Sequence, residues 1–152
     1  MTQISQTIQL PDSQSAIALA GSNEQNLKLL ARHTGVKLIL RGQDLLLQGQ
    51  TKAVERCVKA IQTLEPLWSM GKPLHEPDIL TAFQAIDTGR TEEYSDLQKN
   101  VLARTKKGEV IRAKTFKQKQ YIKSIQKHDV TFAIGPAGTG KTFLAAVLAV
   151  KA

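Results

Sequence analysis

The chain has little of several features that whole classes of protein require. It has one cysteine, Cys57, in 152 residues, which excludes an internal disulfide and a zinc site built from cysteines. No apolar run approaches the roughly 20 residues that span a bilayer, and the N-terminus lacks the basic-then-apolar pattern of a secretion signal. We therefore expect a soluble cytoplasmic protein without membrane contact, in which Cys57 is a small core residue.

Acidic residues are scarce in the last third of the chain. Residues 103–152 carry 11 basic and 2 acidic side chains, a balance of +9, whereas residues 1–66 and 67–102 have balances of +2 and −3. A basic segment of this kind attracts polyanions through counterion release, so it predicts contact with nucleic acid. The alternative is a solvated basic face that keeps the protein soluble. The side chains expected at nucleic-acid phosphates are Arg104, Lys106, Lys107, Arg112 and Lys114.

The most informative motif is Gly-Pro-Ala-Gly-Thr-Gly-Lys-Thr at residues 135–142. It matches G-x-x-x-x-G-K-[ST], the phosphate-binding loop (Walker A motif) of nucleoside triphosphatases. The apolar run at 130–134 predicts a buried parallel strand before the loop, and the Ala- and Leu-rich residues 143–152 predict a helix after it. This order of strand, loop and helix predicts binding of ATP with Mg²⁺, and the alternative is a glycine-rich turn that happens to fit.

Each residue type in this loop has a physical role. Glycines at 135, 138 and 140 have no Cβ, so the backbone can adopt positive φ and bring its N–H groups close to the α- and β-phosphates. We expect the ammonium group of Lys141 at the β- and γ-phosphates and the hydroxyl of Thr142 on Mg²⁺. The full predicted contact set is Gly135, Pro136, Ala137, Gly138, Thr139, Gly140, Lys141 and Thr142.

A helix is predicted to begin at residues 117–122, upstream of the loop, and it contains a candidate adenine contact. Gln118 lies 17 residues before Gly135. In helicase-like ATPases a glutamine at about this distance reads adenine, because a side-chain amide can pair with N6 and N7 together. We predict this role for Gln118, with a polar surface residue as the alternative, and expect Tyr121 to pack against the base or the core.

The first 66 residues predict a small α+β module. Period-two alternation predicts a first strand through Ile4, Ile8 and Leu10, and runs at 36–40 and 45–47 predict a hairpin around residues 41–44. Three helices are expected, each with a start signal. They cover residues 13–20 with Asp12 or Ser13 as cap, Asn23 (cap) to a stop at Gly35, and Thr51 (cap) to Leu64.

The resulting order, β-α-α-β-β-α, resembles a type I KH domain. The resemblance extends to residues 21–38, a glycine loop followed by a helix, Thr34-Gly35 and a strand. In KH domains a GXXG loop clamps four nucleotides of single-stranded nucleic acid. Here Glu24 stands at the second glycine position, where a carboxylate would repel a phosphate. Direct RNA binding and a scaffold role in oligomerisation or docking are therefore both open.

Residues 67–102 are net acidic and predict a linker. Proline is concentrated at its start, and residues 77–86 predict one short amphipathic helix ending near Gly89. The expected organisation is thus a KH-like domain at 1–66, an acidic linker at 67–102 and the beginning of an α/β P-loop ATPase domain at 103–152. The acidic Mg²⁺ ligand, the water-positioning group and the arginine needed for hydrolysis normally follow the loop. We therefore expect the front part of a longer ATPase that hydrolyses little ATP alone.

Together the KH-like module, the acidic linker and residues 107–115 and 132–142 resemble the PhoH family over nearly the whole chain. The resemblance implies a cytoplasmic bacterial ATP-binding protein with a helicase-like core, truncated just after the Walker A motif. It further implies a link to RNA metabolism and phosphate starvation, an endoribonuclease partner and a homo-oligomer at full length. Three alternatives stay open: an RNA-binding module with a vestigial loop, a small-molecule kinase and an inactive gene fragment.

Overall fold

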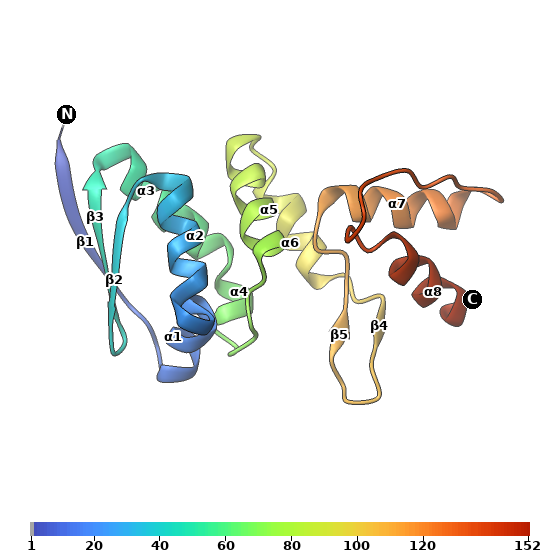
Figure 1. The fold of residues 1–152 in the computed structure, drawn as a ribbon, viewed down its shortest axis with the longest axis horizontal. Coiled ribbons are helices and arrows are strands. Elements are labelled where there is room, and N and C mark those ends of the chain that lie inside the picture. The colour runs from blue at the N-terminus through green and yellow to red at the C-terminus, as the bar shows by residue number, and fades with distance from the viewer. Residues whose placement is uncertain (1) are drawn as a thin grey trace. The chain divides into compact units, whose positions relative to one another are not determined.

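The first three strands of the chain form one antiparallel sheet in the order β1-β3-β2 (Figure 1). In the computed structural model, which describes residues 2–152, they are β1 (Gln3–Gln9), β2 (Lys37–Arg41) and β3 (Asp44–Gln50). Arg41 pairs with Asp44, so Gly42 and Gln43 form a two-residue turn, and Gly42 has the positive φ (61°) that such turns require. The predicted strands and hairpin are therefore confirmed.

Three helices accompany this sheet. They are α1 (Ser13–Ala20), α2 (Gln25–Thr34) and α3 (Thr51–Thr63); α2 and α3 contact the strands, and α1 contacts α2. Leu30, Leu45 and Cys57 are completely buried, so the core lies between the helices and one face of the sheet. The element order is the predicted one, the protein is α+β, and Cys57 is the core residue expected from its neighbours.

The predicted helix caps are right in one case and wrong in two. The carboxylate of Asp12 caps α1 by accepting from the Ser15 amide at 2.7 Å. Asn23, in contrast, lies in a short 3-10 helix (η1, Ser22–Glu24) with φ of 51°, because asparagine tolerates the left-handed region. Thr51 is the first residue of α3, and its hydroxyl donates instead to the Thr2 carbonyl at 3.1 Å.

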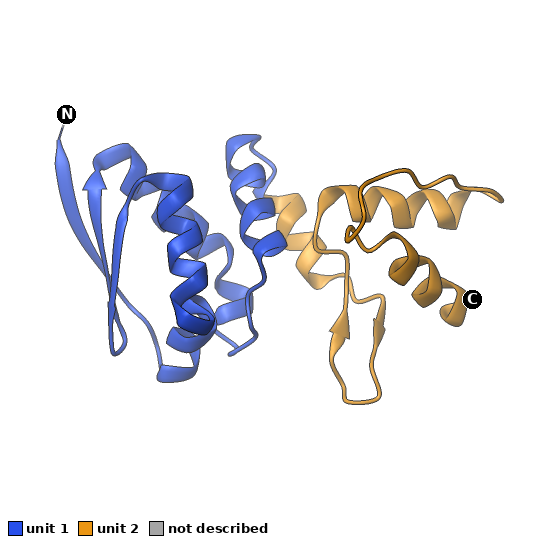
Figure 2. Ribbon diagram, in the orientation of Figure 1, with its two compact units in different colours: residues 1–91 blue, residues 92–152 orange. Residues whose placement is uncertain are grey.

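Two further helices pack on the first three. α4 (Glu65–Trp68) contacts α1 and α3, and α5 (Glu76–Asp87) contacts α2 and α3. The buried indole of Trp68 donates to the Ile61 carbonyl at 2.8 Å. The helix predicted at 77–86 is confirmed as α5. The first compact unit of the chain consequently ends at Thr91, beyond the predicted KH-like segment (Figure 2).

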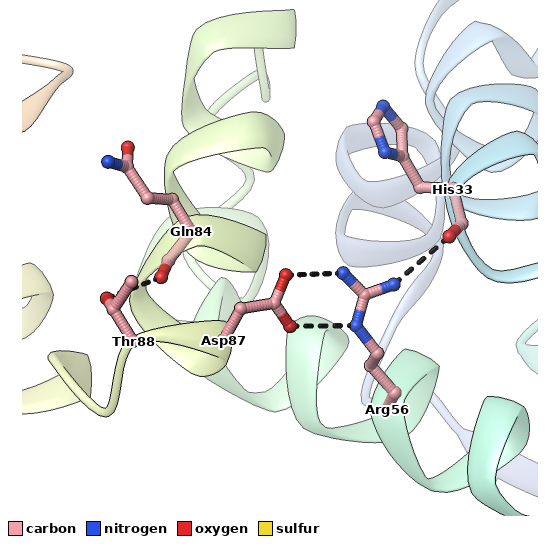
Figure 3. Close-up of polar contacts among 5 residues, drawn as sticks. All are labelled: His33, Arg56, Gln84, Asp87 and Thr88. Atoms are coloured by element: carbon pink, nitrogen blue, oxygen red, sulfur yellow. Dashed lines mark hydrogen bonds and ion pairs between the residues drawn. The ribbon is translucent and has the colours of Figure 1, made fainter.

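A polar cluster holds α5 in place within this unit (Figure 3). The Arg56 guanidinium on α3 donates to both carboxylate oxygens of Asp87 on α5, at 3.0 and 2.7 Å, and to the His33 carbonyl at 3.0 Å. It also lies 4.7 Å from the ring centre of Phe83, which stacks on His33. The hydrogen bonds between the pair raise the pKa of Arg56 and lower the pKa of Asp87.

The second compact unit, residues 92–152, is mostly helical. It comprises α6 (Thr91–Lys99) apart from the first residue of that helix, a short hairpin of β4 (Ala103–Arg104) and β5 (Val110–Ile111), α7 (Phe116–Lys127) and α8 (Lys141–Lys151). The hairpin strands are antiparallel, and α7 contacts α8. The helices predicted near 117 and at 143–152 are confirmed. Among residues 2–152, no helix is both long enough and apolar enough to cross a bilayer.

The strand predicted at 130–134 is wrong for this structure. The segment is irregular, and Val130, Phe132 and Ile134 are 71%, 88% and 98% exposed. A strand requires a hydrogen-bonded neighbour. Within the described part of the chain the sheets are β1-β3-β2 and β4-β5, and neither includes this segment. The segment is apolar, as a buried strand would be, but composition alone does not supply a pairing partner.

Candidate phosphate-binding loop

The glycine loop, defined as residues 135–142, leads directly into α8. Gly138 and Gly140 have φ of 80° and 81°, in the left-handed region that favours glycine, whereas Gly135 does not adopt positive φ. Gly140 is the N-cap of α8 and contributes no side-chain hydrogen bond to it. The first N–H groups of α8 therefore have no side-chain cap, and they form the positive end of the helix dipole.

Lys141 folds back over the start of the loop. Its ammonium group donates to the carbonyl of Gly135 and, at 3.2 Å, to that of Pro136. The hydroxyl of Thr139 also donates to the Pro136 carbonyl, at 3.0 Å. A cation held only by neutral carbonyl oxygens is stabilised further when anionic oxygens replace them, because hydrogen bonds between charged groups are stronger than those to neutral acceptors. The arrangement is therefore suited to receive an anion.

Gln118 joins the beginning of α7 to the glycine loop. Its Oε1 accepts from the Lys114 amide at 2.7 Å, and its Nε2 donates to the Thr139 carbonyl at 3.1 Å. The Gln118 backbone amide in turn donates to the hydroxyl of Thr115, the cap of α7, at 3.1 Å. Both ends of the amide predicted at adenine are thus bonded to the protein, which fixes the orientation of the side chain.

Tyr121 forms a second link between α7 and α8. Its hydroxyl donates to the carbonyl of Lys141 at 3.0 Å. Sequence reasoning assigned this ring to the base or the core without foreseeing the bond. The available signal was its spacing, since Tyr121 lies three residues after Gln118 and so on the same face of α7. The structure thus brings Gln118 and Tyr121 together at the glycine loop.

The predicted Mg²⁺ contact rests on the Thr142 side chain. Thr142, on the first turn of α8, is exposed. Among residues 2–152, no group of three or more His, Cys, Asp or Glu side chains is arranged to hold a metal ion. The described chain therefore offers the Thr142 hydroxyl for Mg²⁺ without a carboxylate cluster to accompany it.

The five predicted phosphate-contacting basic residues divide into two groups. Arg104, Lys106 and Lys107 lie on the β4-β5 hairpin and its turn, and all three are exposed. Arg112 and Lys114 precede α7 and are half-buried; the guanidinium of Arg112 donates to the Ala113 carbonyl at 3.3 Å. The hairpin therefore presents its cations to solvent, whereas the other two basic residues lie closer to the body of the unit.

The GXXG-like turn of the first unit is built around Glu24. Gly21 has φ of 74°, and Glu24, at the second glycine position, has φ of 57°. A Cβ at Gly21 would lie 2.7 Å from the amide nitrogen of Asn26, a buried side chain that donates to the carbonyls of Ala18 and Leu74. Gly21 is thus required for packing, and the exposed Glu24 carboxylate stands where a KH loop has glycine.

Comparisons with known proteins give the family. Residues 110–152 match the family model described as PhoH-like protein. The whole chain is 62% identical to a PhoH-like protein of Synechocystis sp. over 152 residues, covering 46% of that protein. The chain belongs to the PhoH-like family. PhoH-like proteins of Bacillus subtilis and Mycobacterium tuberculosis are 30% and 33% identical to it, with 98% and 99% of the chain and 46% and 42% of those proteins covered.

The PhoH-like matches include the residues of the glycine loop and the residues that contact it. The family model covers β5, α7, the glycine loop and α8, so every contact described around Lys141 falls inside it. The PhoH-like relatives also align with the first unit, because their matches include nearly all of the chain. The chain spans about half the length of the curated relatives it matches. No solved structure matches it.

Proposed function

We propose that the glycine loop binds the phosphates of ATP, as the nucleotide site of a PhoH-like protein that acts on RNA. The observation that carries the proposal is the position of Lys141, whose ammonium group is held by two loop carbonyls beside an uncapped helix start. With ATP bound, this group would move to the phosphate oxygens. Backbone N–H groups of the loop and of α8 would donate to the same phosphates.

The residues present fit a magnesium nucleotide in part. The Thr142 hydroxyl is exposed and free to ligate Mg²⁺. Bound Mg²⁺ would neutralise charge on the β- and γ-phosphates. The carboxylate that normally accompanies the hydroxyl would come from the part of the longer PhoH-like proteins that this chain does not cover. ATP binding is thus proposed for the chain, and hydrolysis for the whole protein.

Gln118 would add adenine recognition to phosphate binding. To pair with N6 and N7 it would release the Lys114 amide and the Thr139 carbonyl, its present partners. Because Thr139 belongs to the loop, recognition of the base would change the loop that holds the phosphates. An adenine nucleoside triphosphate is therefore the proposed ligand.

The RNA part of the proposal is supported by both units. The order β-α-α-β-β-α and the antiparallel sheet of the first unit support a KH-like module. The exposed cations of the β4-β5 hairpin suit a nucleic-acid backbone. The Glu24 carboxylate makes the hairpin the better candidate surface. A cytoplasmic location, an endoribonuclease partner and a homo-oligomer at full length complete the proposal and rest on the family resemblance.

Calorimetry with MgATP tests the nucleotide site. The chain should bind MgATP, and Lys141→Ala should abolish the heat, whereas Lys59→Ala, an exposed lysine of the first unit, should leave it unchanged. Equal binding by the parent chain and Lys141→Ala, or no binding by the parent chain, would overturn the proposal.

A second candidate is an RNA-binding module in which the loop binds no nucleotide. The exposed, irregular segment 130–134 favours it, because a phosphate loop normally follows a paired strand. In that case the chain would bind single-stranded RNA, Lys141→Ala would not change the RNA affinity, and MgATP would give no heat.

A further inference from the structure

A small cavity lies within the second unit, between α6, α7 and the end of α8. Its volume is about 110 Å³. The apolar side chains that line it are all buried, whereas the polar ones are exposed or, for Lys119, half-buried. The apolar residues are Leu97, Leu102, Ala113 and Ile122, and the polar residues are Asn100, Lys119, Lys123, Gln126 and Lys151. We call this feature the lysine cavity.

The polar lining is cationic and lacks a counter-charge. Lys119, Lys123 and Lys151 line the cavity, and no carboxylate does. Among residues 2–152, none of these three ammonium groups has an ion-pair partner. Lys119 and Lys123 are four residues apart on one face of α7, where like charges repel each other. An anion in the cavity would relieve that repulsion.

We propose that the lysine cavity binds a backbone phosphate of single-stranded RNA, with part of the nucleoside on its apolar floor. The inference rests on the proposed action on RNA and gives it a second contact surface besides the β4-β5 hairpin. The three ammonium groups would attract the negatively charged backbone. The amides of Asn100 and Gln126 can donate to and accept from a ribose or base edge. The apolar floor suits a nucleoside better than a bare phosphate ion.

The lysine cavity is separated from the glycine loop by the length of α8. Lys141 begins this helix and Lys151 ends it, and ten residues of helix rise about 15 Å. The cavity and the loop would therefore bind different phosphates at the same time. Both sites draw on α7 and α8: Lys119 of the cavity follows Gln118, which contacts the Thr139 carbonyl of the loop, and α8 carries Lys141 and Lys151.

Fluorescence anisotropy with a labelled 12-nucleotide oligo(U) tests the proposal. The variant Lys119→Gln/Lys123→Gln/Lys151→Gln should bind at least tenfold more weakly than the parent chain. The plot of log K against log salt should become shallower by about 0.7, because one phosphate contact on a single strand contributes about that much to its slope. The matched control is Lys52→Gln/Lys59→Gln/Lys72→Gln, which removes the same charge from exposed sites of the first unit outside residues 21–38 and should change affinity less than twofold.

Circular dichroism melts check that both triple variants fold; if the cavity variant does not, Lys123→Gln alone should still weaken binding more than Lys59→Gln. Equal losses in the two triple variants, or none in the cavity variant, would overturn the cavity while leaving RNA binding by the chain intact. Two competitors identify other ligands for the cavity. If poly-glutamate at an equal carboxylate concentration displaces the RNA, the ligand is an acidic protein; if UMP at an equal phosphate concentration displaces it, the ligand is a free nucleotide. Either result would overturn the proposal of an RNA backbone phosphate. Absence of RNA binding by the parent chain would overturn both the cavity and the RNA part of the proposed function, and MgATP calorimetry would still report on the loop separately.

Discussion

The guanidinium of Arg56 on α3 donates to both carboxylate oxygens of Asp87 on α5, at 3.0 and 2.7 Å. This pair attaches a segment that the sequence predicts to be a linker. Residues 76–87 lie in that segment, and its proline and acidic content are the basis of the prediction. Asp87, one of its acids, instead attaches α5 to the first unit. The same guanidinium covers the Phe83 ring and bonds the His33 carbonyl, so one side chain connects α2, α3 and α5.

Breaking this pair should destabilise the first unit modestly. Arg56→Gln and Asp87→Asn should each lower the free energy of unfolding by about 1 kcal/mol, because the side chains are 33% and 50% exposed and solvent screens them. The double variant should show a coupling of about 0.5 kcal/mol. Urea unfolding followed by the fluorescence of Trp68, the single tryptophan, measures this. A coupling of zero would show that the pair contributes nothing.

The same pair predicts a pH dependence of stability. Arg56 holds the pKa of Asp87 below its ordinary value of 3.8. A carboxylate with a lowered pKa contributes stability that is present above the ordinary value and is lost as the pH falls below about 4. The difference in unfolding free energy between the parent chain and Asp87→Asn should therefore shrink between about pH 5 and pH 3. A constant difference over that range would contradict this origin.

Two glycines of the loop should respond differently to alanine. Gly138→Ala and Gly140→Ala both place a Cβ at positive φ, which costs about 1 kcal/mol. A Cβ at Gly138 meets open space, whereas at Gly140 it lies 3.3 Å from Nε2 of Gln118. Gly140→Ala should therefore lower the melting temperature of the second unit and its MgATP affinity more than Gly138→Ala. In a Gln118→Ala background, the two glycine variants should lower the melting temperature and the MgATP affinity by equal amounts. An equal effect of the two single variants in the parent chain would exclude the contact between Cβ and Gln118.

Cys57 should be unreactive in the folded chain. Burial raises the pKa of its thiol to about 11, so little thiolate is present at pH 8. The native chain should not react with a disulfide reagent within minutes at that pH, and the urea-unfolded chain should react at once. Cys57→Ala should react in neither state and serves as the blank. Rapid reaction of the native chain would mean that the core around α3 opens readily.

The parts of this structure that sequence predicts well are those set by local rules. Alternating apolar residues gave β1, and the short turn at Gly42 gave the β2-β3 hairpin. Of the three loop glycines for which the motif favours positive φ, Gly138 and Gly140 adopt it and Gly135 does not. The caps at Asn23 and Thr51 were wrong for two different reasons. Asn23 adopts a left-handed turn, and the hydroxyl of Thr51 donates to the carbonyl of Thr2, 49 residues earlier in the chain.

Contacts between distant segments were not predictable in the same way. Nothing in the spacing of Gln118 and Thr139, 21 residues apart, indicates that the amide of one reaches the carbonyl of the other. The docking of α5 likewise depends on Arg56, 31 residues before Asp87. The strand expected at 130–134 depends on a neighbour that the described residues do not provide.

Phe132 and Ile134 project into solvent from a stretch of main chain whose amides belong to no sheet. Short, uncharged, β-prone sequences in this state pair readily with identical copies of themselves. Concentrated solutions of the 152-residue polypeptide will therefore self-associate through this stretch, and a charged replacement such as Ile134→Lys should keep it dispersed.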